Sequence, residues 1–257
     1  MYTTDQYEGL IAETIVIPGH NGDLINAYLA RPLGPGPFPG MVLAHNIFGF
    51  APWYKDTARK YAYQGYLAIC PNLFHREGPG TPEDVAAKAR AAGGIADDQA
   101  VGDLAAAMRY LKSLPSSNGK VGIFGTCSGG RHAYLTGCRT PGFDAVVDCW
   151  GGRVVAAPTD LTPKAPVAPI DYTKDLACPL LGIFGNDDRG PNPDQVNQHE
   201  AELKRLGKQY EFHRYDGAGH GFFYHDRANY RQEQAVDAWQ KLFAFLEGHL
   251  GTPGAGK

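Results

Sequence analysis

The chain has 257 residues, of which 43% are hydrophobic and 20% are charged, and we expect a single α/β domain over residues 1–257. A net charge of −3 gives no electrostatic reason to bind nucleic acid or an anionic membrane surface. The five cysteines include no Cys-x-x-Cys pair, which argues against a disulfide framework or a zinc site. The N-terminus lacks a signal-peptide pattern, and no apolar stretch is long enough to span a membrane. We therefore expect a cytoplasmic protein, a monomer or small homo-oligomer, whose partner is a small molecule.

In chain order, the first predicted element is an antiparallel hairpin at one edge of a sheet, formed by Glu13–Ile17 and Leu24–Ala30 around an Asn-Gly turn. Short apolar runs then alternate with helical patterns, which predicts a mostly parallel central sheet with helices on both faces. Apolar residues at helical spacing predict helices around Val101–Leu111 and Val236–Leu246. The apolar runs are Met41–Ala44, Tyr66–Cys70, Val121–Phe124, Ala145–Cys149 and Leu180–Phe184.

Two segments lack these patterns. Residues 152–175 contain too much proline for a helix or a central strand, and we expect a long surface excursion that acts as a lid. Residues 251–257 are rich in glycine and are expected to form a frayed tail.

The most informative motif is Gly125-Thr126-Cys127-Ser128-Gly129, which joins a predicted strand to a predicted helix. This Gly-x-nucleophile-x-Gly spacing is typical of a nucleophile elbow, whose sharp turn needs small residues on both sides of the central residue. Ser128 lies one place past the apex, where its side chain would turn toward the helix. The motif therefore predicts Cys127 as a nucleophile.

An acid and a base follow in the chain order nucleophile, acid, histidine that is found in α/β-hydrolases. Asp187 comes after the predicted strand at 180–184, and His220 comes after another at 210–215. Asp188 competes with Asp187 for the role of the acid, and we favour Asp187 for its position after the glycine. His220 would accept the thiol proton, because the thiolate is the attacking species. The Ser128 and Ile47 amides are the candidate oxyanion-hole donors.

Four segments together resemble the dienelactone hydrolase family, also called carboxymethylenebutenolidases, over nearly the whole chain. They are Ala44–Gly49, Cys70–Arg76 with the following Pro79–Thr81, Ser117–Gly122 leading into the elbow, and Gly217–Phe222. The resemblance implies an α/β-hydrolase fold with Cys127, Asp187 and His220 as the triad and Ile47 and Ser128 as the oxyanion hole. It also implies that Arg76 contacts a substrate carboxylate through its two-pronged guanidinium.

Two substrate-binding positions depart from the pattern of this family. Asn46 stands where the dienelactone-cleaving members typically carry a glutamate, and Tyr224 stands where they carry a second carboxylate-binding arginine. We hypothesise that Asn46 leaves Cys127 free to share its proton with His220 in the resting state. Arg131 and Arg153 are further candidates for contact with an anion.

These features predict a cysteine-dependent hydrolase that cleaves a lactone or small carboxylic ester, with or without a carboxylate, through an acyl-thioenzyme. The alternatives are a hydrolase of another ester or thioester class and a noncatalytic binding module of the same fold. Nucleotide binding is disfavoured, because the glycines match neither a P-loop nor Gly-x-Gly-x-x-Gly. We expect no metal and no cofactor, since the spacing of His213, His220, His225 and Asp226 matches no metal-binding pattern.

Overall fold

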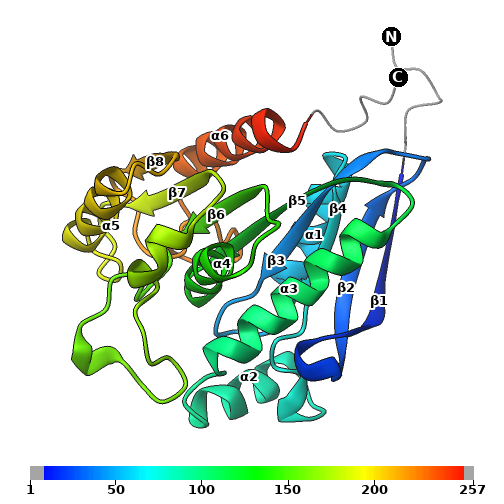
Figure 1. Cartoon of the computed structure of the whole chain (residues 1–257), viewed down its shortest axis with the longest axis horizontal. Coiled ribbons are helices and arrows are strands. Elements are labelled where there is room, and N and C mark those ends of the chain that lie inside the picture. Colours follow the sequence, from blue (N-terminus) through cyan, green and yellow to red (C-terminus); the bar gives the residue numbers. More distant parts are fainter. Residues whose placement is uncertain (1–8, 252–257) are drawn as a thin grey trace.

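The computed structural model describes residues 9–251, and its eight strands form one sheet in the order β1-β2-β4-β3-β5-β6-β7-β8. Figure 1 shows β1 and β8 at opposite edges of this sheet. The strands are β1 (Leu10–Pro18), β2 (Leu24–Pro32), β3 (Phe38–Ala44), β4 (Leu67–Pro71), β5 (Ser117–Thr126), β6 (Ala145–Cys149), β7 (Leu180–Gly185) and β8 (Tyr210–Tyr215).

The sheet is parallel except at the edge formed by the N-terminal hairpin. β1 pairs antiparallel with β2, and β2 pairs antiparallel with β4, whereas the pairs from β4 through β3 to β8 are all parallel. The predicted hairpin and the mostly parallel sheet are confirmed. The six parallel strands end at one edge of the sheet, which is where α/β folds place their functional loops.

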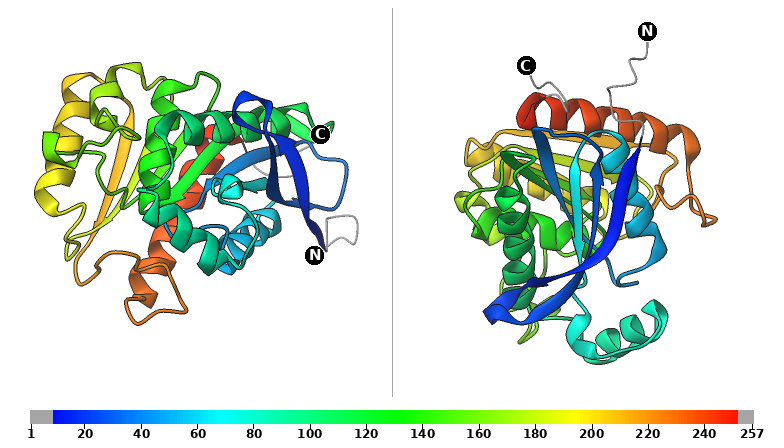
Figure 2. Two further views of the ribbon diagram at one scale, coloured as in Figure 1. Left: turned by 90° about the horizontal axis from the view of Figure 1, so that it is seen from below. Right: turned by 90° about the vertical axis from the view of Figure 1, so that its right-hand side faces the viewer.

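Helices cover both faces of the sheet, as predicted. One apolar cluster joins the sheet to α3 and α4, and a second joins the opposite face to α1 and α6; the two further views in Figure 2 show these layers. Val236, which the sequence pattern placed on the buried face of the last helix, is 49% exposed, so the prediction was wrong for this residue. The helices are α1 (Pro52–Tyr63), α2 (Pro82–Ala91), α3 (Asp97–Ser113), α4 (Ser128–Arg139), α5 (Pro193–Arg205) and α6 (Gln232–Leu250).

The proline-rich segment 152–175 is only partly the surface excursion that we expected. Its second half forms a short 3-10 helix, Pro169–Asp175, in which Thr173 is buried and its hydroxyl shares a 2.6 Å hydrogen bond with that of Tyr134 on α4. Before this helix, Lys164 donates to the carbonyl oxygens of Ala92 and Gly94, just after the end of α2. Figure 1 shows this segment and α2 at the same end of the molecule.

Gly251 follows the last turn of α6, and the rest of the expected tail, residues 252–257, lies outside the described residues. Within residues 9–251, no helix is both long enough and apolar enough to cross a membrane.

The first turn of α4 lies against the backbone of the central strands, and only glycine permits this approach. A Cβ atom on Gly129 would overlap with the carbonyl oxygen of Ala44 on β3, and one on Gly125 would overlap with the backbone of Gly129 itself. Because these neighbours are backbone atoms, no side-chain rotation can relieve the overlap. The glycines on both sides of Cys127 are therefore required by packing.

We predict that Gly129→Ala lowers the free energy of unfolding by about 3 kcal/mol, because it forces α4 away from β3. Gly248→Ala is the matched control: this glycine lies in α6 with nothing within 4 Å of the added Cβ. It should raise stability by about 0.5–1 kcal/mol through helix propensity. Urea denaturation measures both changes, and equal stabilities for the two variants would contradict this account of the packing.

Candidate active site

Cys127 occupies the turn between β5 and α4 in a left-handed conformation, with φ 57° and ψ −126°. A non-glycine residue rarely adopts this conformation, and such strain is common at functional sites. The Cys127 N–H donates to Cys149 O on β6 at 3.0 Å, which ties the turn to the neighbouring strand. The side chain is half-buried at the N-terminal end of α4, where the helix dipole favours a negative charge.

His220 lies in the loop after β8 and is hydrogen-bonded on both sides. Its Nδ1 lies 2.8 Å from Oδ2 of Asp188, and the ring also makes a hydrogen bond with the Cys127 side chain. Asp188 is buried, and its other oxygen accepts from the Gly190 N–H at 2.8 Å. Cys127, His220 and Asp188 thus form one continuous hydrogen-bonded row.

The acid of this row corrects the expectation from the sequence, which favoured Asp187. Asp187 is exposed, and its N–H donates to Ala218 O. The Asp188 N–H instead donates to Gly185 O, closing a turn after β7 that brings the second aspartate to His220. The sequence contained both residues, but the turn selects between them.

The electrostatics of this row stabilise a protonated His220. Burial of the ring lowers its pKa, but the hydrogen bonds and negative charges of Asp188 and Cys127 outweigh burial and raise the pKa from 6.5 to about 10. The ring therefore carries a positive charge near neutral pH, next to the Cys127 side chain.

A cavity of about 560 Å³, here called the Cys127 cavity, opens in front of the row. Ile47, Ser128 and His220 also line it, so the predicted oxyanion-hole residues lie beside the predicted nucleophile and base. The Ile47 N–H has no hydrogen-bond partner among residues 9–251. Residues 156, 160–162, 164 and 165 of the proline-rich segment form another wall.

Arg76 lies outside this cavity, which corrects the role that the family resemblance implied. Its guanidinium donates two hydrogen bonds, of 2.8 and 3.1 Å, to the carboxylate of Asp103 and one of 2.8 Å to Asp23. The Asp103 side chain is fully buried. Arg76 therefore pairs with a buried carboxylate and does not line the Cys127 cavity.

The two other candidate arginines both line the Cys127 cavity but differ in their partners. Arg131 is held by two hydrogen bonds to the carboxylate of Asp97, of 2.5 and 2.9 Å. Arg153 is exposed, and its guanidinium has no hydrogen-bond or ion-pair partner in the described part of the chain. Arg153 alone of the two can offer its donors to another molecule.

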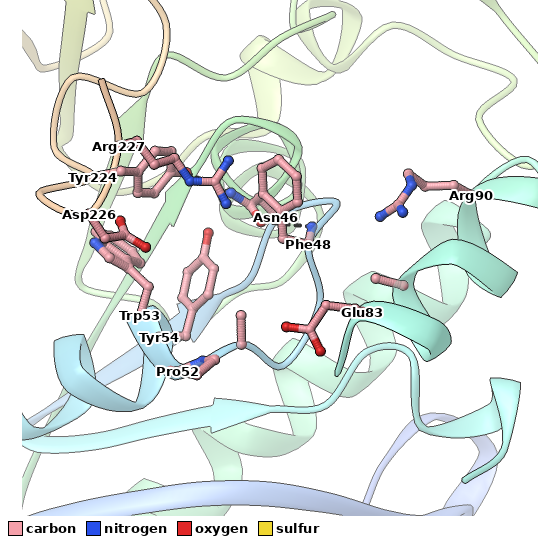
Figure 3. Close-up of a pocket in the computed structure, with 12 residues that line it drawn as sticks. Asn46, Phe48, Pro52, Trp53, Tyr54, Glu83, Arg90, Tyr224, Asp226 and Arg227 are labelled. Carbon is pink, nitrogen blue, oxygen red and sulfur yellow. Dashed lines mark hydrogen bonds between the residues drawn. The ribbon is translucent and has the colours of Figure 1, made fainter. Parts of the chain in front are cut away.

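The two expected substrate-binding positions that depart from the family pattern contact each other. Asn46 Nδ2 donates to the Tyr224 hydroxyl at 2.6 Å, and both side chains are buried. They line a second cavity of about 300 Å³, here called the Asn46 cavity, and not the one that contains Cys127. Figure 3 shows this cavity, with Tyr224 and Arg227 on one side and Arg90 of α2 on the other.

Sequence reasoning missed two groups near the site. The first is a chain of hydrogen-bonded hydroxyl groups. The Tyr224 hydroxyl shares a 2.7 Å hydrogen bond with that of Thr126, the residue directly before Cys127, and the Thr126 hydroxyl shares one of 2.6 Å with that of Tyr54. Arg90 lines both cavities, and its Nη1 donates to Ile47 O at 2.8 Å. Neither group had a motif that could have revealed it. No group of three or more His, Cys, Asp or Glu within residues 9–251 could hold a metal ion.

Comparison with known proteins gives consistent similarities over most of the chain. The model of the dienelactone hydrolase family matches residues 25–250. A protein of Methylorubrum extorquens named "putative carboxymethylenebutenolidase" is 35% identical over 243 residues, which cover 91% of this chain and 80% of the relative. A protein of Bradyrhizobium sp. named "probable 2-oxo-3-(5-oxofuran-2-ylidene)propanoate lactonase" is 32% identical over 236 residues, covering 90% and 92%.

A solved structure of the same family is also similar to this chain. The crystal structure of a "putative dienelactone hydrolase" from Klebsiella pneumoniae superposes with a TM-score of 0.86 at 29% identity. The match covers 94% of this chain and 100% of the other. The family match over residues 25–250 spans the positions of Cys127, Asp188 and His220.

We predict that Arg76→Ala lowers the free energy of unfolding by about 3 kcal/mol, because it leaves the buried Asp103 carboxylate without its charged partner. Asp23→Ala removes the exposed partner of the same arginine and should cost less than about 1 kcal/mol. Urea denaturation tests both. A raised KM for Arg76→Ala with unchanged stability would instead support the role in substrate binding.

Proposed function

Because the chain belongs to the dienelactone hydrolase family, a family of lactone and ester hydrolases, we propose that it cleaves a lactone or small carboxylic ester through an acyl-thioenzyme on Cys127. The observation that carries this proposal is the hydrogen-bonded row in which His220 joins Cys127 to a buried Asp188. The row combines a nucleophile, a base and a carboxylate that orients the base.

The first half of the reaction forms the acyl-thioenzyme. The Cys127 thiolate attacks the carbonyl carbon of the ester, and the N–H groups of Ile47 and Ser128 stabilise the oxyanion that forms. The His220 imidazolium then gives its proton to the leaving alkoxide as the C–O bond breaks. In a lactone, the leaving alkoxide stays attached to the acyl group.

The second half releases the acid. His220 is neutral after giving up its proton, so it can take a proton from water as the water attacks the thioester carbonyl. The same two N–H groups stabilise the second oxyanion, and Cys127 leaves as the thiolate. Asp188 supports both halves by keeping His220 in the tautomer that presents Nε2 to the thiol.

Arg153 would meet the anionic group of a substrate that carries a carboxylate. It lines the Cys127 cavity with unused donors, whereas Arg76 and Arg131 are occupied by Asp103 and Asp97. A guanidinium suits this role because it binds a carboxylate with two parallel hydrogen bonds.

A substrate panel tests the function directly. We expect the wild-type protein to turn over at least one of a set of enol-lactones, aryl esters and thioesters, and Cys127→Ala to lose that activity by about 10⁴-fold or more. Activity assays with product detection measure both. Equal turnover by the two proteins would exclude Cys127 as the nucleophile, and no turnover of any substrate would favour a noncatalytic binding module.

Asp188→Asn tests the acid and its effect on pH. It removes the charge that holds the His220 pKa near 10, so the pKa falls toward 6.5 and fewer rings are charged between these values. We expect kcat to fall by about 10²–10⁴-fold. Iodoacetamide should alkylate Cys127 more slowly than in the wild type between about pH 6.5 and 10, and the rates should converge above pH 10.

The neighbouring Asp187→Asn is the matched control, because this carboxylate is exposed and is not the partner of His220. It should keep the wild-type kcat and the wild-type alkylation profile. The reverse result, a large loss in Asp187→Asn and none in Asp188→Asn, would restore Asp187 as the acid.

A further inference from the structure

The turn that carries Ile47 is held by hydrogen bonds of both its backbone and its side chains. The Gly49 N–H donates to Asn46 O at 2.9 Å, which closes a four-residue turn. Gly49 has a positive φ of 76°, and glycine is favoured at the last position of such a turn. Asn46 also accepts the Phe48 N–H on its side-chain oxygen at 2.9 Å. This second bond, from side chain to the N–H two residues on, is an Asx-turn that a glutamate is too long to form in the same way.

The peptide that contains the Ile47 N–H is fixed through its carbonyl end. Asn46 O accepts from Gly49 and also from Nδ1 of His45 at 3.0 Å. His45 is a reliable donor there, because its Nε2 accepts the Leu73 N–H and burial lowers the pKa of the ring to about 4. In a planar trans peptide the N–H points opposite to the C=O, so these bonds set the direction of the Ile47 N–H.

The next peptide, between Ile47 and Phe48, is held at both of its polar atoms. Its N–H donates to Asn46 Oδ1, and its C=O accepts from Nη1 of Arg90 at 2.8 Å. The Phe48 ring is also covered by the guanidinium of Arg227, 4.0 Å from the ring centre. Two successive peptide planes are thus fixed, which leaves the Cα of Ile47 little freedom to move.

Arg90 comes from a separate part of the chain and, unlike the distant Arg227, hydrogen-bonds the backbone of the turn. It lies on α2, forty-three positions from Ile47, and lines both the Cys127 cavity and the Asn46 cavity. Figure 3 shows it extending from α2 toward the turn that carries Asn46 and Phe48. Its guanidinium therefore stands between the two cavities.

We propose that Arg90 and Asn46 are positioning residues that hold the 46–49 turn so that the Ile47 N–H meets the oxyanion. This inference rests on the proposed function, and it assigns to Asn46 a role different from that of a charged residue at the same position. Neither residue needs to touch the substrate. Their loss should slow the chemical steps without weakening binding or changing the Cys127 thiol.

The experiment compares Arg90→Ala, Arg90→Lys and Lys88→Ala on a neutral aryl ester, so that no substrate charge is involved. Removal of an oxyanion-hole donor costs about 10²–10³-fold in kcat, and its misplacement in Arg90→Ala should cost about 10–100-fold. KM should stay within about 2-fold. Arg90→Lys keeps a cationic donor and should recover most of the loss. Lys88→Ala removes a cation from the same helix and should match the wild type.

Alkylation of Cys127 by iodoacetamide distinguishes a misplaced Ile47 N–H from a general distortion of the site. The thiolate displaces iodide without forming an oxyanion, so the reaction does not need the Ile47 N–H. We expect the wild-type alkylation rate and pH profile in Arg90→Ala. Asn46→Gln, which keeps the amide but lengthens its side chain by one methylene, should show the same signature of lower kcat and unchanged alkylation. Unchanged kcat in Arg90→Ala, or a parallel loss of kcat and alkylation in both variants, would overturn the proposal.

The proposed function fails in a different way. If Cys127→Ala turns over the ester as well as the wild type does, the acyl-thioenzyme is excluded. If Cys127→Ala is inactive while Arg90→Ala is fully active, the acyl-thioenzyme stands and only the positioning role is lost.

Discussion

The close approach of α4 to the central strands is the constraint on which the site depends. With glycine at 125 and 129, the helix begins against the backbone of β3, and the residue between them is forced into a left-handed conformation. Cys127 is thereby exposed to the Cys127 cavity. Three other cysteines show the contrast: Cys70, Cys138 and Cys149 are buried, and burial raises the pKa of each thiol, to about 12 for Cys138. A buried thiol of this kind is inert.

Charge within the site is set by few groups. Asp188 and Cys127 raise the pKa of His220 although burial opposes it. The neighbouring Asn46, Tyr224 and Thr126 form a hydrogen-bonded chain of uncharged groups, since burial raises the pKa of Tyr224. The two departures from the family pattern are thus one hydrogen-bonded pair that carries no charge. That Asn46 leaves Cys127 free to share its proton with His220 stays a hypothesis.

The parts that could be predicted from the sequence are those fixed by local pattern. The hairpin, the parallel strands and the elbow follow from turn residues, apolar runs and glycine spacing, and each of these acts over a few residues. Which aspartate reaches His220 depends on one turn, closed by the hydrogen bond from the Asp188 N–H to Gly185 O. The sequence is compatible with either aspartate, because it does not reveal this turn. The contacts of Arg76 and Arg90 could not be predicted, because their partners, Asp103 and Ile47, lie far away in the sequence.

Rapid quench with mass spectrometry detects the acyl-thioenzyme on Cys127 itself. The protein is mixed with a slowly deacylated aryl ester, quenched in acid from milliseconds to seconds, and mapped by peptide mass. We predict that an acyl group appears on the Cys127 peptide before steady-state turnover, and that Cys127→Ala never acquires it. An acyl group on Ser128, or product release at every time point without any adduct on Cys127, would contradict the mechanism.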